Sequence, residues 1–420
     1  MPGCVLLIAY HFPPVAGSSG LQRTLAFCRH LRECGWSPVV LSVNPAAFER
    51  TSASQLADIP ADVPVIRTLA LDAARHLAIH GRYWRRLGIP DRWSSWRMTA
   101  VPCGLQLIRK HRVDVVWSTY PIATAHRIGA SLARLSGRPW VADFRDPMVE
   151  KLSGTDEMFP SDPLLRRARL AIERKAADSA AKLIFCTAAA KGIVAERYPW
   201  ISESRMAVIS NGYDEEAFQD ADTILPSMTH SPRKVLLHSG VIYPTRDRDP
   251  SALFKALRVL ADEGVLSPAN FELRLRDPSS EQYFRDLSVL HGIERLVTIA
   301  PSLAYRDALS EMMRSDGLLV LQGITSNPAV PAKLYEYLRA GRPIIALVHP
   351  DGETARLLRE VGIDSSAPLT EPILIANLLR KWLSDVSESG KEGLPKADIT
   401  CYSRRQLTRR LAEQLDQLTS

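Results

Sequence analysis

One stretch of the chain, Pro331–Pro343, has the residue pattern of a short helix that joins two buried strands. Pro331 suits the first helical position, where its missing N–H costs nothing, and Gly341 suits a left-handed residue just after the helix. The apolar runs Gly317–Gln322 and Ile344–Val348 flank the helix and predict buried strands. A strand, a helix and a second strand in this order form a parallel βαβ unit. The stretch therefore predicts an α/β fold that binds ligands at the carboxyl ends of its strands.

The residues around this helix offer groups that suit an anion. The loop Gly323–Val330 falls at the carboxyl edge of the predicted sheet, where its backbone N–H groups and the helix N-terminus are expected to cradle an anion. Lys333 and Glu336 are three residues apart and share one helix face. By spacing alone they form an exposed ion pair over packed leucines, and ligand binding is the functional alternative.

Length and composition limit the remaining possibilities. A chain of 420 residues exceeds one ordinary core, so two domains are expected. The net charge of 53 − 46 = +7 suits anionic partners such as sugar nucleotides or an acidic lipid surface. The six cysteines show no metal-binding spacing and are interpreted as reduced cytosolic thiols. The chain has no apolar run of about 18 residues, so no membrane span is predicted.

The N-terminal part repeats the alternation of strands and helices. Val5–Ala9 predicts a first buried strand, and a Gly/Ser loop with Gly17 and Gly20 follows it before a helix that carries Arg23. These glycines would let backbone approach a phosphate closely, or they form a plain strand-to-helix turn.

Charged residues gather at the end of a later strand. Asp143, Arg145 and Asp146 end the run Pro139–Pro147, and charges there cost burial energy unless they are paired or face a ligand. His126, on a preceding helix, is the nearby imidazole. An Asp–Arg structural network and a buried structural histidine are the simpler interpretations.

Basic and aromatic residues alternate between residues 75 and 112, including Trp84, Trp93 and Trp96. This mixture suits a membrane interface. Nucleic-acid binding would use the same residue types. An ordinary surface insertion with inward-packed tryptophans is slightly favoured, and no nucleic-acid partner is predicted.

Domain limits follow from the loss of periodicity. Residues 1–218 form the first predicted lobe, 219–232 a linker, 233–397 the second lobe, and 398–420 a terminal helix.

The segment around Glu336 resembles the glutamate-containing helix of family 4 glycosyltransferases. The stretch PWVADFRDP at Pro139–Pro147, with Ser118-Thr-Tyr-Pro and the following His126, resembles a bacterial subgroup of these enzymes. The resemblance implies the GT-B architecture, in which two Rossmann-like parallel-sheet lobes face an interlobe cleft and a C-terminal helix crosses back. It covers nearly the whole chain.

The resemblance assigns roles to individual residues. Glu336 matches the second Glu of the E-x7-E motif, which binds the donor ribose. The donor-binding set it implies is Gly17, Gly20, Gly240, Arg246, Pro331, Lys333 and Glu336. The catalytic set is Arg145, Asp146, His126 and Asp143. Three positions depart from the family: Pro328 replaces the first Glu, Val241 replaces an Arg, and Arg145 stands where relatives often have His.

The implied activity is a retaining, metal-independent, hexosyltransferase-type glycosyltransferase. It uses a nucleoside-diphosphate sugar as donor substrate and no cofactor, and its acceptor is a polysaccharide precursor, a glycolipid or a metabolite. The implied location is the cytoplasm, with peripheral contact to the inner face of the membrane as an extension. A non-catalytic nucleotide-sugar-binding or scaffold protein is the main alternative, and a sugar-nucleotide epimerase is the third.

Overall fold

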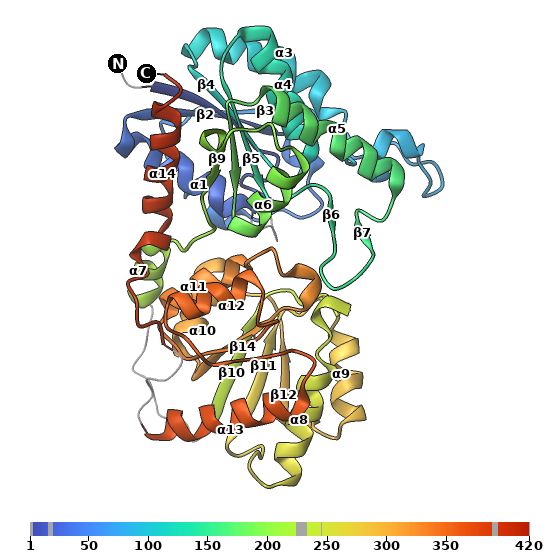
Figure 1. The fold of residues 1–420 in the computed structure, drawn as a ribbon, viewed down its shortest axis with the longest axis vertical. Helices are drawn as coiled ribbons and strands as arrows, with labels where there is room; N and C mark the ends of the chain where they lie inside the picture. The colour runs from blue at the N-terminus through green and yellow to red at the C-terminus, as the bar shows by residue number, and fades with distance from the viewer. Residues whose placement is uncertain (1–2, 16–19, 224–232, 245, 389–393, 420) are drawn as a thin grey trace. The chain divides into compact units, whose positions relative to one another are not determined.

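A computed structural model of the chain describes residues 3–15, 20–223, 233–244, 246–388 and 394–419. The chain forms two compact units (Figure 1). Unit 1 contains Met1–Gly212 and Arg404–Ser420, and unit 2 contains Tyr213–Ser403.

Unit 1 is built on a parallel sheet in the order β3-β2-β1-β4-β5-β8-β9. Its strands are short apolar runs with buried residues on both faces, as parallel sheets require. In chain order they are β1 Gly3–Ile8, β2 Trp36–Val43, β3 Val65–Thr68, β4 Val115–Thr119, β5 Trp140–Arg145, β8 Lys182–Phe185 and β9 Met206–Val208.

Different helices cover the two faces of this sheet. One face packs against α3 Trp96–His111, α4 Ala123–Ser136 and α5 Pro163–Ser179, through strand residues that include Leu6, Ala142 and Phe144. The opposite face packs against α1 Gly20–His30 and α14 Arg404–Asp416, through strand residues that include Val5, Leu7 and Val141. Successive side chains of a strand point to opposite faces, so each strand supplies both cores.

The C-terminal helix α14 belongs to unit 1, as the sequence predicted. Leu407, Leu411 and Leu415 lie on one side of α14 and are buried in the core beneath α1. The indole Nε1–H of Trp36 donates to Asp416 at 2.8 Å. The chain therefore leaves unit 1 and returns to it after completing unit 2.

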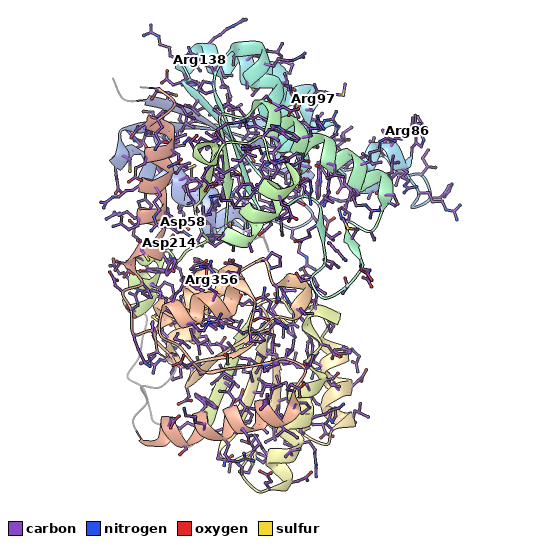
Figure 2. The ribbon with its side chains drawn as sticks, viewed as in Figure 1. Asp58, Arg86, Arg97, Arg138, Asp214 and Arg356 are labelled. Carbon is purple, nitrogen blue, oxygen red and sulfur yellow. The ribbon has the colours of Figure 1, made fainter. Side chains whose placement is uncertain are left out.

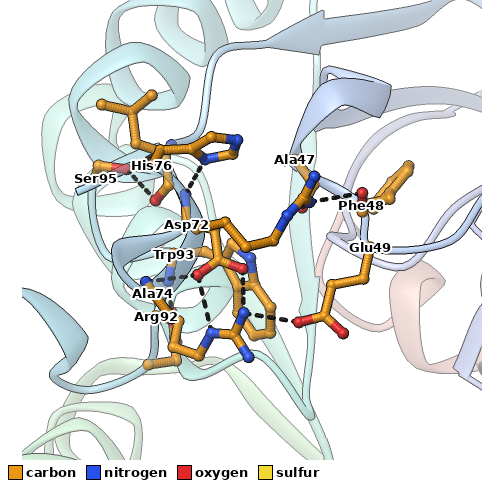
Figure 3. A network of polar contacts seen from close by, with 12 residues as sticks. Ala47, Phe48, Glu49, Asp72, Ala74, His76, Arg92, Trp93 and Ser95 are labelled. Carbon is orange, nitrogen blue, oxygen red and sulfur yellow. Dashed lines mark hydrogen bonds and ion pairs between the residues drawn. The ribbon is translucent and has the colours of Figure 1, made fainter. Parts of the chain in front are cut away.

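The basic and aromatic segment before α3 is anchored by one guanidinium. Arg92 donates to both carboxylate oxygens of Asp72 and, at 2.7 Å, to Glu49 (Figure 3). Trp96 is fully buried, as the inward-packing interpretation predicted, whereas Trp84 is 67% exposed. The segment therefore combines a packed base with an exposed tip.

Shorter elements complete unit 1. They are the helices η1 Leu31–Cys34, η2 Pro45–Ala47, η3 Ala53–Gln55, α2 Ala73–His76, η4 Arg85–Gly88, α6 Ala188–Arg197 and η5 Glu203–Arg205, and the hairpin β6 Glu150–Lys151 with β7 Met158–Phe159.

Unit 2 has a second parallel sheet in the order β12-β11-β10-β13-β14-β15. Its strands are β10 Lys234–Ser239, β11 Phe271–Arg276, β12 Val297–Ala300, β13 Gly317–Leu321, β14 Ile344–Leu347 and β15 Ser366–Ala367. One face packs on α8 Ser251–Asp262, α9 Glu281–Leu290 and α13 Pro372–Glu388. The other packs on α7 Glu215–Thr223, α10 Tyr305–Arg314, α11 Ala332–Ala340 and α12 Glu353–Glu360. The short helices of the unit are η6 Arg246–Arg248, η7 Glu294–Leu296, η8 Ile324–Ser326 and η9 Thr400–Tyr402.

The start of the predicted linker is helical instead. Residues 219–223 belong to α7, and residues 224–232 lie outside the described residues. Phe218 and Ala221 of this helix are buried in the core of unit 2. The contact-based boundary consequently falls earlier, between Gly212 and Tyr213. The burial of Phe218 and Ala221 stabilises a helix here, although the composition of residues 219–232 is polar.

Candidate functional site

The carboxyl edge of the unit 1 sheet carries a buried ion pair. Arg23 of α1 donates through Nε to Asp143 at 2.8 Å and through Nη2 at 3.1 Å. Thr119 donates to the same carboxylate at 3.2 Å, and a further Arg23 N–H donates to the Ser210 carbonyl at 2.9 Å. Burial alone would lower the pKa of Arg23, but the Asp143 carboxylate raises it above its ordinary value. The pair fixes α1 on the ends of β4 and β5.

Arg145 ends β5 in an unusual backbone conformation. Its φ is +62°, in the left-handed region that residues with a Cβ seldom adopt. One guanidinium N–H donates to the Tyr120 carbonyl at 3.4 Å, whereas the buried Nε has no partner among the described residues. Such strained positions are common at ligand sites. Arg145 therefore presents a buried cation at the strand end.

Two carboxyl groups that follow Arg145 in the chain have raised pKa values. Burial raises the pKa of Asp146, against the opposing effect of Arg145. Burial, with a smaller contribution from the charge of Asp146, also raises the pKa of Glu150 to about 7. A carboxyl group with a pKa near neutrality is suited to proton transfer. Glu150 was not predicted from the sequence, because a single glutamate outside a strand end carries no motif.

His126 lies on the other face of the sheet from Asp143. Its ring packs against Phe144, with centroids 4.9 Å apart, and side-chain alternation points Phe144 and Asp143 to opposite faces. Burial lowers the pKa of His126 to about 3, so the ring is neutral. The expectation that His126 is the imidazole beside Arg145 is therefore wrong.

A second imidazole, that of His11 in the loop that follows β1, interacts electrostatically with Arg145. Burial, together with the positive charge of Arg145, lowers the pKa of His11 to about 4. The sequence contained a usable signal, because His11 lies three residues after the end of β1, and β1 pairs with β4 near the centre of the sheet. Asp143, Arg145, Asp146 and His11 thus form one cluster, and His126 is outside it.

In unit 2, the end of β10 and the start of α11 come together around Gly240 and Lys333. Gly240 has φ +94°, and a Cβ at this position would lie 3.6 Å from Lys333 Nζ. Lys333 Nζ lies 3.1 Å from His238 Nε2. The first N–H groups of α11 have no intrahelical acceptor and carry the positive end of the helix dipole. The arrangement is suited to a phosphate group.

Lys333 has a lowered pKa, and a bound anion would raise it. Burial, reinforced by the positive charge of Arg248, lowers the pKa of Lys333 to about 7, although Glu336 opposes this shift. Burial and Lys333 also lower the pKa of His238, which is neutral and accepts the ammonium hydrogen bond. An incoming anion would stabilise the charged lysine.

Glu336 lies one turn further along the same helix. Its carboxylate accepts a hydrogen bond from the Tyr305 hydroxyl at 3.0 Å. The next residue, Tyr337, is fully buried, and its hydroxyl accepts from the Ser239 N–H at 2.8 Å. This bond ties α11 to the end of β10 and fixes the positions of Lys333 and Glu336.

The loop between β13 and α11 differs from the prediction of an open anion cradle. The Asp247 carboxylate accepts hydrogen bonds from the Ser326 N–H at 3.1 Å and from the Ser326 hydroxyl at 2.7 Å. It also accepts from the Thr325 hydroxyl. Gln322 donates to the carbonyls of Ser326 and Ala329, at 2.8 and 2.9 Å. The Asp247 carboxylate therefore accepts the hydrogen bond of the Ser326 N–H, one of the loop amides that were expected to face an anion.

The remaining predicted residues lie as follows. Gly20 is the buried first residue of α1, and Pro331 is the N-cap of α11 rather than its first helical residue. Gly17 and the Arg246 side chain lie outside the described residues. Val241 follows Gly240, and Pro328 lies between η8 and α11. Neither residue carries a charge that could replace the family's Arg or Glu.

Within the described ranges, no group of three or more His, Cys, Asp or Glu residues is arranged to hold a metal ion. The same ranges contain no helix long and apolar enough to cross a membrane.

Comparisons with known proteins concern the family of the N-terminal part and the fold of the whole chain. Residues 20–212 match the family described as Glycosyl transferase 4-like domain. HepE from Anabaena, solved with UDP and glucose, aligns over 99% of this chain and 100% of its own, with TM-score 0.66 and 16% identity. Sucrose-phosphate synthase from Thermosynechococcus elongatus aligns over 99% of both chains, with TM-score 0.65 and 14% identity.

The fold is GT-B. A UDP-N-acetylglucosamine 2-epimerase also aligns, over 98% of this chain and 95% of its own, with TM-score 0.55 and 12% identity. The chain matches no curated protein by sequence. At these identities the solved structures establish the two parallel-sheet lobes and the returning C-terminal helix, and the chemistry depends on the residues of the sites.

Proposed function

We propose that this GT-B protein is a retaining glycosyltransferase that transfers a sugar from a nucleoside-diphosphate donor. The observation that carries the proposal is the group of Gly240, Lys333 and the α11 N-terminus, with Glu336 one turn further on. A glycine without a Cβ, a half-buried ammonium and the N-terminal N–H groups of a helix suit a diphosphate, and the carboxylate suits ribose hydroxyls. The glycosyl transferase 4-like match of residues 20–212 supports the same assignment.

The proposed donor is a UDP-sugar, because the solved HepE structures hold UDP and UDP-glucose. Leaving-group charge would be stabilised by Lys333 and the helix N-terminus without a metal ion or cofactor. Asp143, Arg145, Asp146 and His11 are the proposed residues around the transferred sugar and acceptor. The acceptor proposed here is a glycan or lipid-linked precursor in the cytoplasm.

The first experiment is a thermal-shift panel of UDP, GDP, ADP and TDP and their common sugars. Wild type is compared with Glu336→Ala and with Glu294→Ala, which changes an exposed glutamate of η7. A native-state ligand at a hundredfold excess over Kd raises the free energy of unfolding by about 2.7 kcal/mol. We expect a shift with one base in wild type and Glu294→Ala, and its loss in Glu336→Ala.

The other function classes predict different results. A scaffold protein would show no shift with any nucleotide. An epimerase would interconvert the free sugar nucleotide without an acceptor, whereas a transferase would only hydrolyse it slowly. Retention is tested by NMR of the anomeric proton in the product, which keeps the donor configuration if the proposal is correct.

Peripheral membrane contact is a second part of the proposal. The exposed tip of unit 1 carries Trp84 at 67% and Ile79 at 76% exposure, and Arg86 lies over the Trp84 ring at 5.8 Å. Such side chains insert at the headgroup level of anionic bilayers. Co-sedimentation with anionic vesicles at low salt should fall when Trp84 and Ile79 are both changed to Ser. Equal sedimentation of the variant would exclude this surface.

A further inference from the structure

A cavity of about 570 Å³ lies in the helical layer of unit 1, among α3, α4 and α5. It shares no residue with the strand-end cluster of Asp143, Arg145, Asp146 and His11. Its apolar lining comes from the segment before α3, from α4, β5 and α5, and consists of Ile89, Pro90, Ala130, Trp140, Ala168, Ala171 and Ile172. Its volume lies in the range of small-molecule sites, which is about 300–1,000 Å³.

The rim of this cavity is cationic. Arg97, Arg127, Arg134 and Lys175 line it, and no carboxylate does. None of the four makes an ion pair within the described part of the chain; Arg97 donates only to the Ser131 hydroxyl, at 3.1 and 3.2 Å. Burial, followed by the charge of Arg97, lowers the pKa of Arg127. The four cations thus lack an anionic partner at the cavity.

The carboxylate that interacts electrostatically with Arg127 is engaged in hydrogen bonds of its own. Asp91 interacts with Arg127 at long range, but its oxygens accept hydrogen bonds from the Thr124 N–H at 2.7 Å and the Thr124 hydroxyl at 2.9 Å. It also accepts from the Trp93 N–H at 3.1 Å. Asp91 therefore stabilises the start of α4 and does not fill the cavity.

A buried histidine adds a hydrogen-bond donor to the lining. The Trp140 Nε1–H donates to Ser118 Oγ at 2.8 Å, and Ser118 Oγ lies 2.7 Å from His126 Nδ1. An indole can only donate, so the Ser118 hydroxyl is free to donate to Nδ1 of the neutral ring. The proton of His126 is thereby assigned to Nε2, which is buried and has no partner in the described residues. A ligand with an acceptor oxygen would satisfy it.

We propose that this cavity binds one single-chain anionic amphiphile, with its phosphate on the arginine rim and its alkyl chain along the apolar floor. Charge complementarity favours the anion, and Ile89, Pro90, Trp140 and Ile172 supply a surface for the chain. The segment that supplies Ile89 and Pro90 also bears the exposed Trp84 and Arg86, and Figure 2 shows Arg86 at its tip and Arg97 apart from it, on α3. The cavity proposal does not depend on glycosyl transfer.

The test is calorimetric titration of the full chain with dodecyl phosphate below its micelle concentration. We expect saturable binding of one molecule per chain, and no binding of inorganic phosphate or of dodecyl maltoside. Ala130→Trp, which fills the cavity, and Arg127→Gln/Arg134→Gln, which removes two rim cations, should each weaken binding at least tenfold. Arg109→Gln/Lys110→Gln removes the same charge from α3 outside the cavity and should bind as wild type.

Two outcomes overturn the proposal: no saturable binding, or equal binding by all variants. A nucleotide thermal shift on the same variants separates this result from a failure of the proposed donor site. Vesicles containing lysophosphatidic acid, which has one acyl chain and a phosphate head, then distinguish two sources of the ligand. If Ala130→Trp weakens vesicle binding as well, the ligand is a membrane lipid; if only dodecyl phosphate binding falls, it is a soluble amphiphile.

Discussion

At the scale of single residues, two buried or half-buried charges of this protein have different surroundings. Arg23 and Asp143 are both buried and meet through two hydrogen bonds. Lys333 has no comparable carboxylate contact, and its pKa falls toward neutrality. The Arg23–Asp143 pair is therefore structural, whereas the Lys333 ammonium is suited to bind an anion.

Asp143→Ala should lower the free energy of unfolding of unit 1 by about 3–5 kcal/mol, because it leaves the Arg23 guanidinium buried without its partner. Denaturant unfolding followed by circular dichroism measures the change. The double variant Arg23→Met/Asp143→Leu should recover most of the loss, since it removes both charges. A similar loss in the single and double variants would show that charge burial is not the cause.

The lowered pKa of Lys333 predicts that the free energy of unfolding depends on pH. Because its folded-state pKa of about 7 lies below its ordinary value of 10.5, the folded chain binds fewer protons than the unfolded chain between these values. The free energy of unfolding of the ligand-free protein should therefore rise with pH from about 7 toward 10. Relative to wild type, Lys333→Met should show a smaller rise in thermal midpoint between pH 6.5 and 9. Parallel profiles would contradict the assignment.

At the scale of elements, the ends of strands and helices are tied together by side chains from other segments. Tyr337 connects α11 to β10, and Asp247 connects η6 to the loop that holds η8. Gly323 allows this approach, because a Cβ there would overlap the Asp247 carbonyl oxygen. These contacts place the α11 N-terminus relative to Gly240.

Asp247→Ala should release the loop between β13 and α11. It removes three hydrogen bonds to a half-buried carboxylate, so we expect a loss of about 2 kcal/mol in the free energy of unfolding. Nucleoside-diphosphate affinity should also fall, because the loop supports the start of α11. Asp286→Ala, on the exposed side of α9, is the matched control and should change stability by less than about 0.5 kcal/mol. Unchanged nucleotide affinity in Asp247→Ala would separate the loop from the donor site.

At the scale of the whole molecule, the chain completes unit 1 only with its last helix. Leu411 is fully buried among strand and α1 residues that lie hundreds of positions earlier in the sequence. Unit 1 is thus discontinuous, and its stability depends on residues that follow unit 2.

Leu411→Asp should destabilise unit 1 strongly, because an unpaired carboxylate cannot be buried against an apolar sheet without a large cost. Differential scanning calorimetry should show a thermal transition at lower temperature than in wild type. Leu290→Asp, at a position 76% exposed on α9, should leave the profile unchanged. An unaltered transition in Leu411→Asp would mean that α14 adds little to the unit 1 core.

The sequence by itself determined the parallel α/β organisation and the two lobes, through chain length and local patterns: short apolar strands, the residues Pro331 and Gly341 that bound α11, and polar residues placed after strands. The return of the C-terminal helix was expected only from the resemblance to the GT-B architecture. Tertiary structure decided which groups meet. His126 lies on the helix-covered face opposite to Asp143, and His11, in the loop after β1, interacts electrostatically with Arg145. Asp247 accepts a hydrogen bond from an amide of a loop far along the chain. Periodicity fixes which side chains share a face, but only the crossover connections fix what lies against that face.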